Sequence, residues 1–80
     1  IARTVAGQLS AGAPVQRNEL LPGDLVFFHD TFRAGLSHVG IYVGGGTFIH
    51  ASSPTRGVCY DELDARYWTA HYHGACRAWQ

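Results

Sequence analysis

Two histidines placed twelve residues apart carry the clearest chemical signal in this sequence. His38 and His50 lie on either side of the glycine run Gly44–Gly46. Imidazole gains and loses a proton near neutral pH, so proteins use it as a general base or as a metal ligand. The 80-residue chain has five histidines, and the others are His29, His71 and His73.

The residues around the glycine run predict a β-hairpin. His38–Val43 alternates between two faces, as a strand does, and Thr47–Ala51 is expected to return beside it. A three-residue loop at Gly44–Gly46 would pair Val43 with Thr47.

That register would bring the two imidazoles to one side of the sheet. Gly40 would lie opposite His50, and His38 would be a diagonal neighbour of His50 with backbones ~7–8 Å apart. A loop one residue longer would put the histidines on opposite sides. The odd-numbered side is expected to face the core; its members are Val39, Ile41, Val43 and Ile49.

Three interpretations of this histidine pair are open. Both imidazoles could be satisfied by ordinary backbone hydrogen bonds. They could instead share a metal ion with further ligands, although the sequence has no regular ligand motif. The further ligand candidates are His29, Asp30, His71 and His73. In the third interpretation one imidazole is a general base, and the other fixes its tautomer and orientation.

The remaining residues predict an α+β domain, in which one short helix precedes an antiparallel meander of four to five strands. Thr4 and Gly12 can begin and end a helix at Thr4–Ala11. Pro22-Gly23 centres a turn over Asn18–Asp24. The other expected elements are strands at Leu25–Phe28, Val58–Leu63 and Tyr72–Trp79 and one helical turn at Asp64–Trp68.

Composition narrows the classes of function. Eighty residues form at most one small domain, and six basic against six acidic side chains leave no net charge. A nucleic-acid or membrane-surface binder would need a basic patch. The longest apolar run, Leu25–Phe28, is far shorter than the ~20 residues that span a bilayer. No leader sequence opens at Ile1, so any export signal is expected upstream.

The two cysteines, Cys59 and Cys76, are too few for a disulfide scaffold and lack the spacing of a metal motif. They could form one bridge outside the cytosol, or stay as two half-buried thiols. Both are expected in strands, away from the helix N-terminus or cation that activates a reactive thiol.

Several strings together resemble the NlpC family of papain-like bacterial cell-wall endopeptidases. They are R-T-V-A-G-Q from Arg3, L-P-G-D-L-V-F-F from Leu21, S-H-V-G-I-Y-V-G-G-G-T-F-I-H-A-S-S from Ser37, D-E-L ending at Leu63 and Y-W ending at Trp68. The resemblance covers nearly the whole chain, from Arg3 to Trp79. It implies a cysteine nucleophile, with His38 as its general base and His50 as the residue that orients the base.

The resemblance also implies a substrate and further site residues. Related enzymes cut peptidoglycan stem peptides, often between D-glutamate and a diamino acid, and are exported to the cell envelope or secreted. Ser37 and Tyr42 are expected along the substrate cleft, with packing as the alternative for Tyr42. Asp24 is expected to fix a turn. No cofactor and no metal ion is expected.

The chain departs from the family pattern at the nucleophile. The D-C-S-G-type motif that carries this cysteine would precede the R-T-x-x-x-Q segment, and therefore residue 1. Residues 1–80 are thus expected to be the C-terminal portion of a single catalytic domain. Alone, this portion would be inactive and would expose an apolar face to the missing N-terminal half. The alternative is a non-catalytic module of the same fold that binds wall peptides or a protein.

Overall fold

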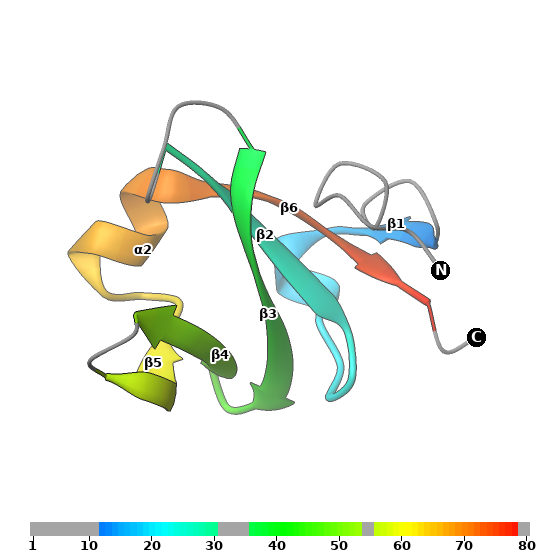
Figure 1. The fold of residues 1–80 in the computed structure, drawn as a ribbon. Coiled ribbons are helices and arrows are strands. Elements are labelled where there is room, and N and C mark those ends of the chain that lie inside the picture. The colour runs from blue at the N-terminus through cyan, green and yellow to red at the C-terminus, as the bar shows by residue number, and fades with distance from the viewer. Residues whose placement is uncertain (1–11, 31–35, 54–55, 79–80) are drawn as a thin grey trace.

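The computed structural model of the protein describes residues 12–30, 36–53 and 56–78 (Figure 1). Its elements are β1 (Ala13–Val15), the 3-10 helix η1 (Arg17–Glu19), β2 (Leu25–His29), β3 (Leu36–Gly44), β4 (Thr47–Ser53), β5 (Gly57–Glu62), α2 (Arg66–His71) and β6 (Tyr72–Arg77). The helix expected at Thr4–Ala11 lies outside the described residues.

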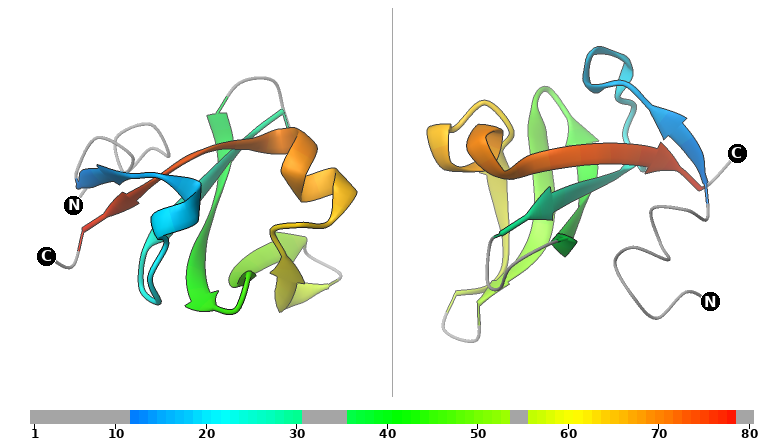
Figure 2. Two further views of the ribbon diagram at one scale, coloured as in Figure 1. Left: turned by 180° about the vertical axis from the view of Figure 1, so that it is seen from behind. Right: turned by 90° about the horizontal axis from the view of Figure 1, so that it is seen from above.

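The strands form one antiparallel sheet in the order β1-β6-β2-β3-β4-β5. This sheet with its short helix confirms the α+β class, and β2 to β5 form the expected meander. The last strand does not extend that meander beyond β5. After α2, the chain crosses back so that β6 pairs with the other edge of β2 (Figure 2).

The sheet has one strand more than the four to five expected, because β1 adds to the outside of β6. Pro14 lies within this three-residue strand, opposite Cys76. Proline has no N–H to give to a ladder, and an edge strand tolerates that loss. A proline-containing segment of three residues gives too short a pattern to predict as a strand.

The helix α2 begins two residues later than the turn expected at Asp64–Trp68 and ends at His71. Ala65 is its N-cap, with the Thr69 N–H donating to the Ala65 carbonyl at 2.9 Å. Among the described residues, none of the helices is both long enough and apolar enough to traverse a bilayer.

The β3–β4 hairpin has the predicted register next to the histidines but not at its turn. Tyr42 pairs with Phe48, as expected, and so does Ile41 with Ile49. The register then shifts, and Gly44 rather than Val43 pairs with Thr47. The predicted Val43–Thr47 pair is therefore wrong.

The physical reason for this shift is the conformation of the glycines. Gly45 and Gly46 both have positive φ, 61° and 81°, as a two-residue type I′ turn requires. Such a turn matches the twist of the flanking strands, so Gly44 joins β3 and Val43 is accommodated as a bulge. The Tyr42 hydroxyl fixes the turn by accepting a hydrogen bond from the Gly46 N–H at 2.8 Å.

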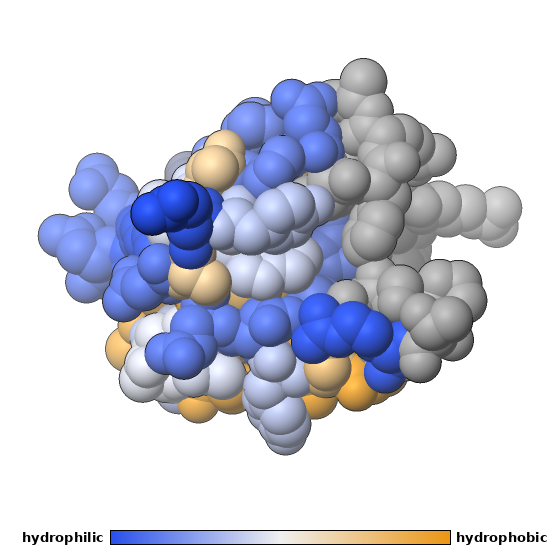
Figure 3. Space-filling view, turned by 90° about the vertical axis from the view of Figure 1, so that its left-hand side faces the viewer, coloured by the Kyte–Doolittle hydropathy of each residue, from blue (hydrophilic) through white to orange (hydrophobic). Residues whose placement is uncertain are grey.

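The core lies on the even-numbered, histidine-bearing side of the hairpin, which corrects the expectation that the odd-numbered side faces it. The core cluster consists of Val26, Phe28, Phe48, Leu63, Trp68 and Ala75. On the odd side, Ile41 and Val43 are 46% and 41% exposed. Leu63 and Trp68, which follow β5, pack against the even side and bury it. Viewed toward α2 and β5, the described surface is largely polar, with apolar residues gathered along its lower edge (Figure 3).

Asp24 fixes the turn before β2, as expected. Its fully buried carboxylate accepts a hydrogen bond from the Leu21 N–H at 2.9 Å. Arg77, at the end of β6, donates to both carboxylate oxygens at 2.8 Å through Nε and Nη2. This hydrogen bonding raises the pKa of Arg77. The bidentate pair therefore holds the start of β2 against the end of the chain's last strand.

We expect Asp24→Asn to lower the thermal unfolding midpoint by roughly 10–20 °C, because it removes one partner of a buried ion pair. Asp64→Asn is the matched control. The Asp64 carboxylate pairs with Arg17 at 3.1 Å but is 91% exposed, so its loss should shift the midpoint by less than about 5 °C. Circular dichroism measures both midpoints, and equal shifts would contradict a special role for the buried pair.

Candidate active site

The two histidines of the hairpin are hydrogen bonded to each other. His38 Nε2 lies 2.8 Å from His50 Nδ1, and the ring centroids are 4.9 Å apart at an interplanar angle of 83°. Both residues are buried, at 8% and 4% exposure. The expectation that β3 and β4 bring both rings to one side of the sheet is confirmed.

A carboxylate extends this pair into a row of three side chains. His50 Nε2 lies 2.7 Å from Asp61 Oδ2, and the Asp61 side chain is 24% exposed while that of His50 is fully buried. Asp61 is not among the site residues predicted from the sequence. The available signal was strand alternation: β5 pairs His50 with Cys59, and Asp61, two residues further along, shares the side of Cys59.

Asp61 gives the row a direction. An ionised carboxylate only accepts hydrogen bonds, so the His50 Nε2 must donate to it. A neutral imidazole has one N–H, which leaves His50 Nδ1 as an acceptor. His38 must then donate through Nε2, and its own Nδ1 is the basic nitrogen. The hydrogen bonds thus assign one tautomer to each ring.

Aromatic side chains surround the two imidazoles. The Trp68 ring stacks on His38 with a centroid distance of 5.8 Å and an interplanar angle of 25°. It meets His50 edge-on with a centroid distance of 4.8 Å. The ring centroid of Phe48 lies 4.7 Å from that of His50, and the ring centroid of Phe28 lies 6.2 Å from that of His38. Burial in this apolar environment, together with the smaller effect of the neighbouring His50, lowers the pKa of His38 to about 4. His38 is therefore a neutral imidazole at pH 7.

Gly40 leaves the space that His50 and Phe48 occupy. A methyl group at Gly40 would lie 2.7 Å from Phe48 Cδ2 and 3.3 Å from His50 Cβ. The first distance is far inside van der Waals contact. The absence of a side chain at Gly40 therefore allows the hairpin to hold the rings side by side, as its position opposite His50 predicts.

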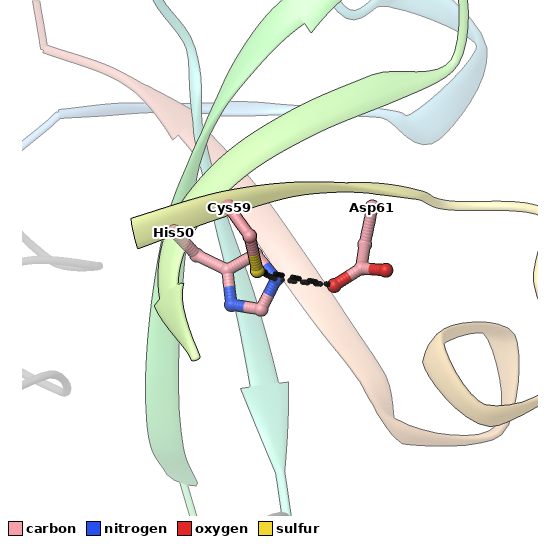
Figure 4. Close-up of side chains that lie close together, drawn as sticks. All are labelled: His50, Cys59 and Asp61. Carbon is pink, nitrogen blue, oxygen red and sulfur yellow. Dashed lines mark hydrogen bonds and ion pairs between the residues drawn. The ribbon is translucent and has the colours of Figure 1, made fainter. Parts of the chain in front are cut away.

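Both cysteines are free thiols, so the disulfide alternative is not formed. Cys76 is buried in β6. Cys59 Sγ lies 3.8 Å from His50 Nε2 and 3.8 Å from Asp61 Oδ2 (Figure 4). It therefore faces the nitrogen that already bonds Asp61, whereas a triad uses the two ring nitrogens for two different partners. This geometry does not suit Cys59 as a nucleophile.

The other predicted site residues lie elsewhere or outside the described side chains. Ser37 lies in β3, and its side chain is outside the described part of the structure. Tyr42 is half-buried against the core, with its hydroxyl bound to the turn. Its role and that of Ser37 along a substrate cleft stay predictions.

The remaining histidines form a separate cluster rather than joining His38 and His50. The His29 ring lies 6.2 Å from that of His71 and 5.9 Å from that of His73. His71 Nδ1 donates to the His29 carbonyl at 2.8 Å. Within the described part of the chain, a different set has metal-ligand proximity, namely His50, Cys59 and Asp61.

Known proteins resemble this chain throughout its length. The NlpC/P60 family model matches residues 1–77. The murein DD-endopeptidase MepH of Escherichia coli is 44% identical over 69 residues, which are 86% of this chain and 26% of that protein. The peptidoglycan DL-endopeptidase CwlO of Bacillus licheniformis is 40% identical over 74 residues, 92% of this chain and 16% of that protein.

Solved structures share the fold as well as the sequence pattern. The crystal structure of an NlpC/P60 family protein from Bacillus cereus has a TM-score of 0.88 and 32% identity, covering 100% of this chain and 27% of that one. This chain therefore spans only a minor part of the length of each of these relatives.

We expect stability to fall as the pH is lowered from 6.5 toward 4. The pKa of His38 is about 4 in the folded protein and about 6.5 for an unperturbed histidine. Between these two pH values the unfolded chain therefore binds a proton that the folded chain does not. The loss attributable to His38 is roughly 3 kcal/mol across the window. Above pH 6.5 both states are neutral at this residue, and the contribution is constant.

Denaturant unfolding at several pH values measures this slope. His38→Gln should remove a large part of it. His73→Gln, which replaces an exposed imidazole, is the control and should retain the slope. Identical pH dependence in the His38→Gln variant and the unaltered protein would show that burial of His38 is not its source.

Proposed function

Because this chain belongs to the NlpC/P60 family, we propose that it contributes the general base and its supporting residues to a cysteine endopeptidase that cleaves peptidoglycan stem peptides. The observation that carries the proposal is the hydrogen-bonded row of His38, His50 and Asp61. A base needs one nitrogen that accepts a proton and a second nitrogen that is held in place, and this row provides both for His38.

The proposed reaction begins with proton transfer from a cysteine thiol to Nδ1 of His38. The resulting thiolate attacks the carbonyl carbon of the scissile amide. His38 then returns the proton to the departing amine nitrogen, and water hydrolyses the thioester that remains. His50 holds the His38 ring and stabilises its positive charge by accepting the Nε2 hydrogen bond.

We place the nucleophilic cysteine in a segment of the full-length protein that precedes Ile1 of this chain, so that residues 1–80 are the C-terminal portion of one catalytic domain. Two observations on the cysteines of this chain support this placement. Cys59 faces the wrong nitrogen of the wrong histidine, and Cys76 is buried in β6. On this proposal the 80-residue chain alone is inactive.

The apolar surroundings of His38 suit this chemistry. Trp68 and Phe28 exclude water from the ring, and this raises the cost of a lone imidazolium. A thiolate beside the ring would offset that cost, because opposite charges attract more strongly at low dielectric. The site therefore favours protonation of His38 by the nucleophilic thiol, which forms a thiolate–imidazolium pair, over protonation of His38 from bulk solvent.

The scissile bond that we propose joins D-glutamate to the diamino acid of the stem peptide. The name of the Bacillus licheniformis relative, a DL-endopeptidase, supports this choice, whereas that of the Escherichia coli relative specifies DD bonds. Peptidoglycan lies outside the cytoplasm, so an extracytoplasmic or secreted location follows from the substrate. Ser37 and Tyr42 are proposed to line the cleft.

His38→Ala in the full-length enzyme should lower kcat by about a hundredfold or more, because it removes the general base. The assay digests purified peptidoglycan and identifies the released peptides by mass spectrometry, which also distinguishes DL from DD cleavage. Circular dichroism verifies folding of the variant. Undiminished turnover would refute His38 as the base, and a wild-type protein that binds stem peptides without cutting them would indicate the binding module instead.

Asp61→Asn should lower kcat by roughly 10- to 100-fold with little change in KM, since Asp61 positions the base without touching substrate. An asparagine amide can present a donor to His50 Nε2 and thereby favour the reversed tautomers in both rings. Asp61→Glu retains an obligate acceptor and should recover most of the activity. A loss in Asp61→Glu as large as that in Asp61→Asn would argue for a purely structural role.

A further inference from the structure

Three potential metal ligands converge at the outer end of the His38–His50–Asp61 row. From these contacts we propose that His50, Cys59 and Asp61 form a site for a thiophilic divalent cation such as Zn²⁺, and that the cation switches the base off. The effect on catalysis rests on the proposed function. The binding itself does not.

The donor atoms fit a compact coordination sphere. His50 Nε2, Cys59 Sγ and Asp61 Oδ2 are separated by 3.8, 3.8 and 2.7 Å (Figure 4). Around tetrahedral zinc, with bonds of about 2.0–2.3 Å, ligand atoms lie roughly 3.3–3.6 Å apart. Only the nitrogen–oxygen pair must open appreciably. Asp61, whose side chain is partly exposed, can supply that movement by rotation.

The chemistry of the set favours a borderline-soft cation. One thiolate, one imidazole and one carboxylate are typical zinc ligands, and the fourth position remains for water. Cys59 and Asp61 are each partly exposed, so an ion can enter from solvent, while the buried His50 forms the floor. Calcium and magnesium prefer sites made of oxygen ligands and do not match this set.

Binding would reverse the tautomers on which the base depends. The cation takes the Nε2 lone pair of His50, so this ring, when neutral, has its proton on Nδ1. That N–H points at His38 Nε2, which must then be an acceptor, and the His38 proton moves to Nδ1. The two rings keep the same number of protons, and the Cys59 thiol releases one to solvent. His38 Nδ1 can then no longer take a proton from the nucleophile.

A neighbouring arginine opposes cation binding at the site. Arg56 Nη2 lies 3.6 Å from Asp61 Oδ2, and the Arg56 side chain is 55% exposed. Its positive charge opposes a cation at Asp61 and must swing outward when the ion binds. The guanidinium is therefore expected to weaken cation binding at this site.

Calorimetric titration of the full-length protein with ZnCl₂ tests the binding. The unaltered protein should show a zinc-binding site whose affinity falls at least about tenfold in Cys59→Ser and rises in Arg56→Gln. Cys76→Ser and His73→Ala are the matched controls for a thiol and an imidazole, and both should bind as the unaltered protein does. Cobalt in place of zinc should give a thiolate-to-metal absorption band that Cys59→Ser abolishes.

Two further measurements test the switch. Zinc should inhibit peptidoglycan cleavage reversibly on chelation, and Cys59→Ser should need at least about tenfold more zinc for the same inhibition. Histidine ¹⁵N NMR should show the His38 proton moving from Nε2 to Nδ1 as zinc is added.

Equal zinc affinity in the unaltered protein and Cys59→Ser would overturn the site. Equal inhibition of the unaltered protein and Cys59→Ser by zinc would place the inhibitory ion at the nucleophile and overturn the switch. Zinc binding without a change of tautomer in His38 would also overturn it. An enzymatically silent protein that still binds zinc through Cys59 would refute the proposed function and leave the cation site intact.

Discussion

The hydrogen bond from His50 to the Asp61 carboxylate is the interaction on which the order of the site depends. Asp61 is the one member of the row whose role as acceptor is fixed by its chemistry, and the two imidazoles take their tautomers from it. Three consecutive strands must be in register for the whole row to form, because each contributes one of its members. The turn glycines, the space at Gly40 and the packing of Trp68 over the rings all preserve that register.

Local chemistry made the hairpin predictable. Three consecutive glycines fix where the chain reverses, and the two-residue period of strands then places His38 and His50 on one side. The exact turn was not predictable from the run of glycines, because a two-residue turn with a bulge and a three-residue loop give the same register beyond Tyr42. The predicted placement of His38 and His50 is therefore correct although the predicted turn is not.

Contacts between distant parts of the chain explain what the sequence did not reveal. Both faces of β3 and β4 offer apolar side chains, so counting them could not decide which face is buried. Trp68, which lies beyond β5 in the chain, decides it by packing on the histidine side. Asp61 escaped notice for a related reason, since its role depends on the register of β5 against β4. The return of β6 to β2 is also set by packing across the sheet and not by any local signal.

The position of β5 at the rim of the sheet has a consequence for how heat acts on the protein. Outer strands have a single neighbour and open at lower free energy than the middle of a sheet. Asp61 is on this rim strand, whereas His38, the proposed base, is on an interior strand. Gentle warming that frays β5 would release the carboxylate while the remaining ladder stays paired. On the proposed function, turnover would therefore fall over a range of temperatures at which most of the fold is still intact.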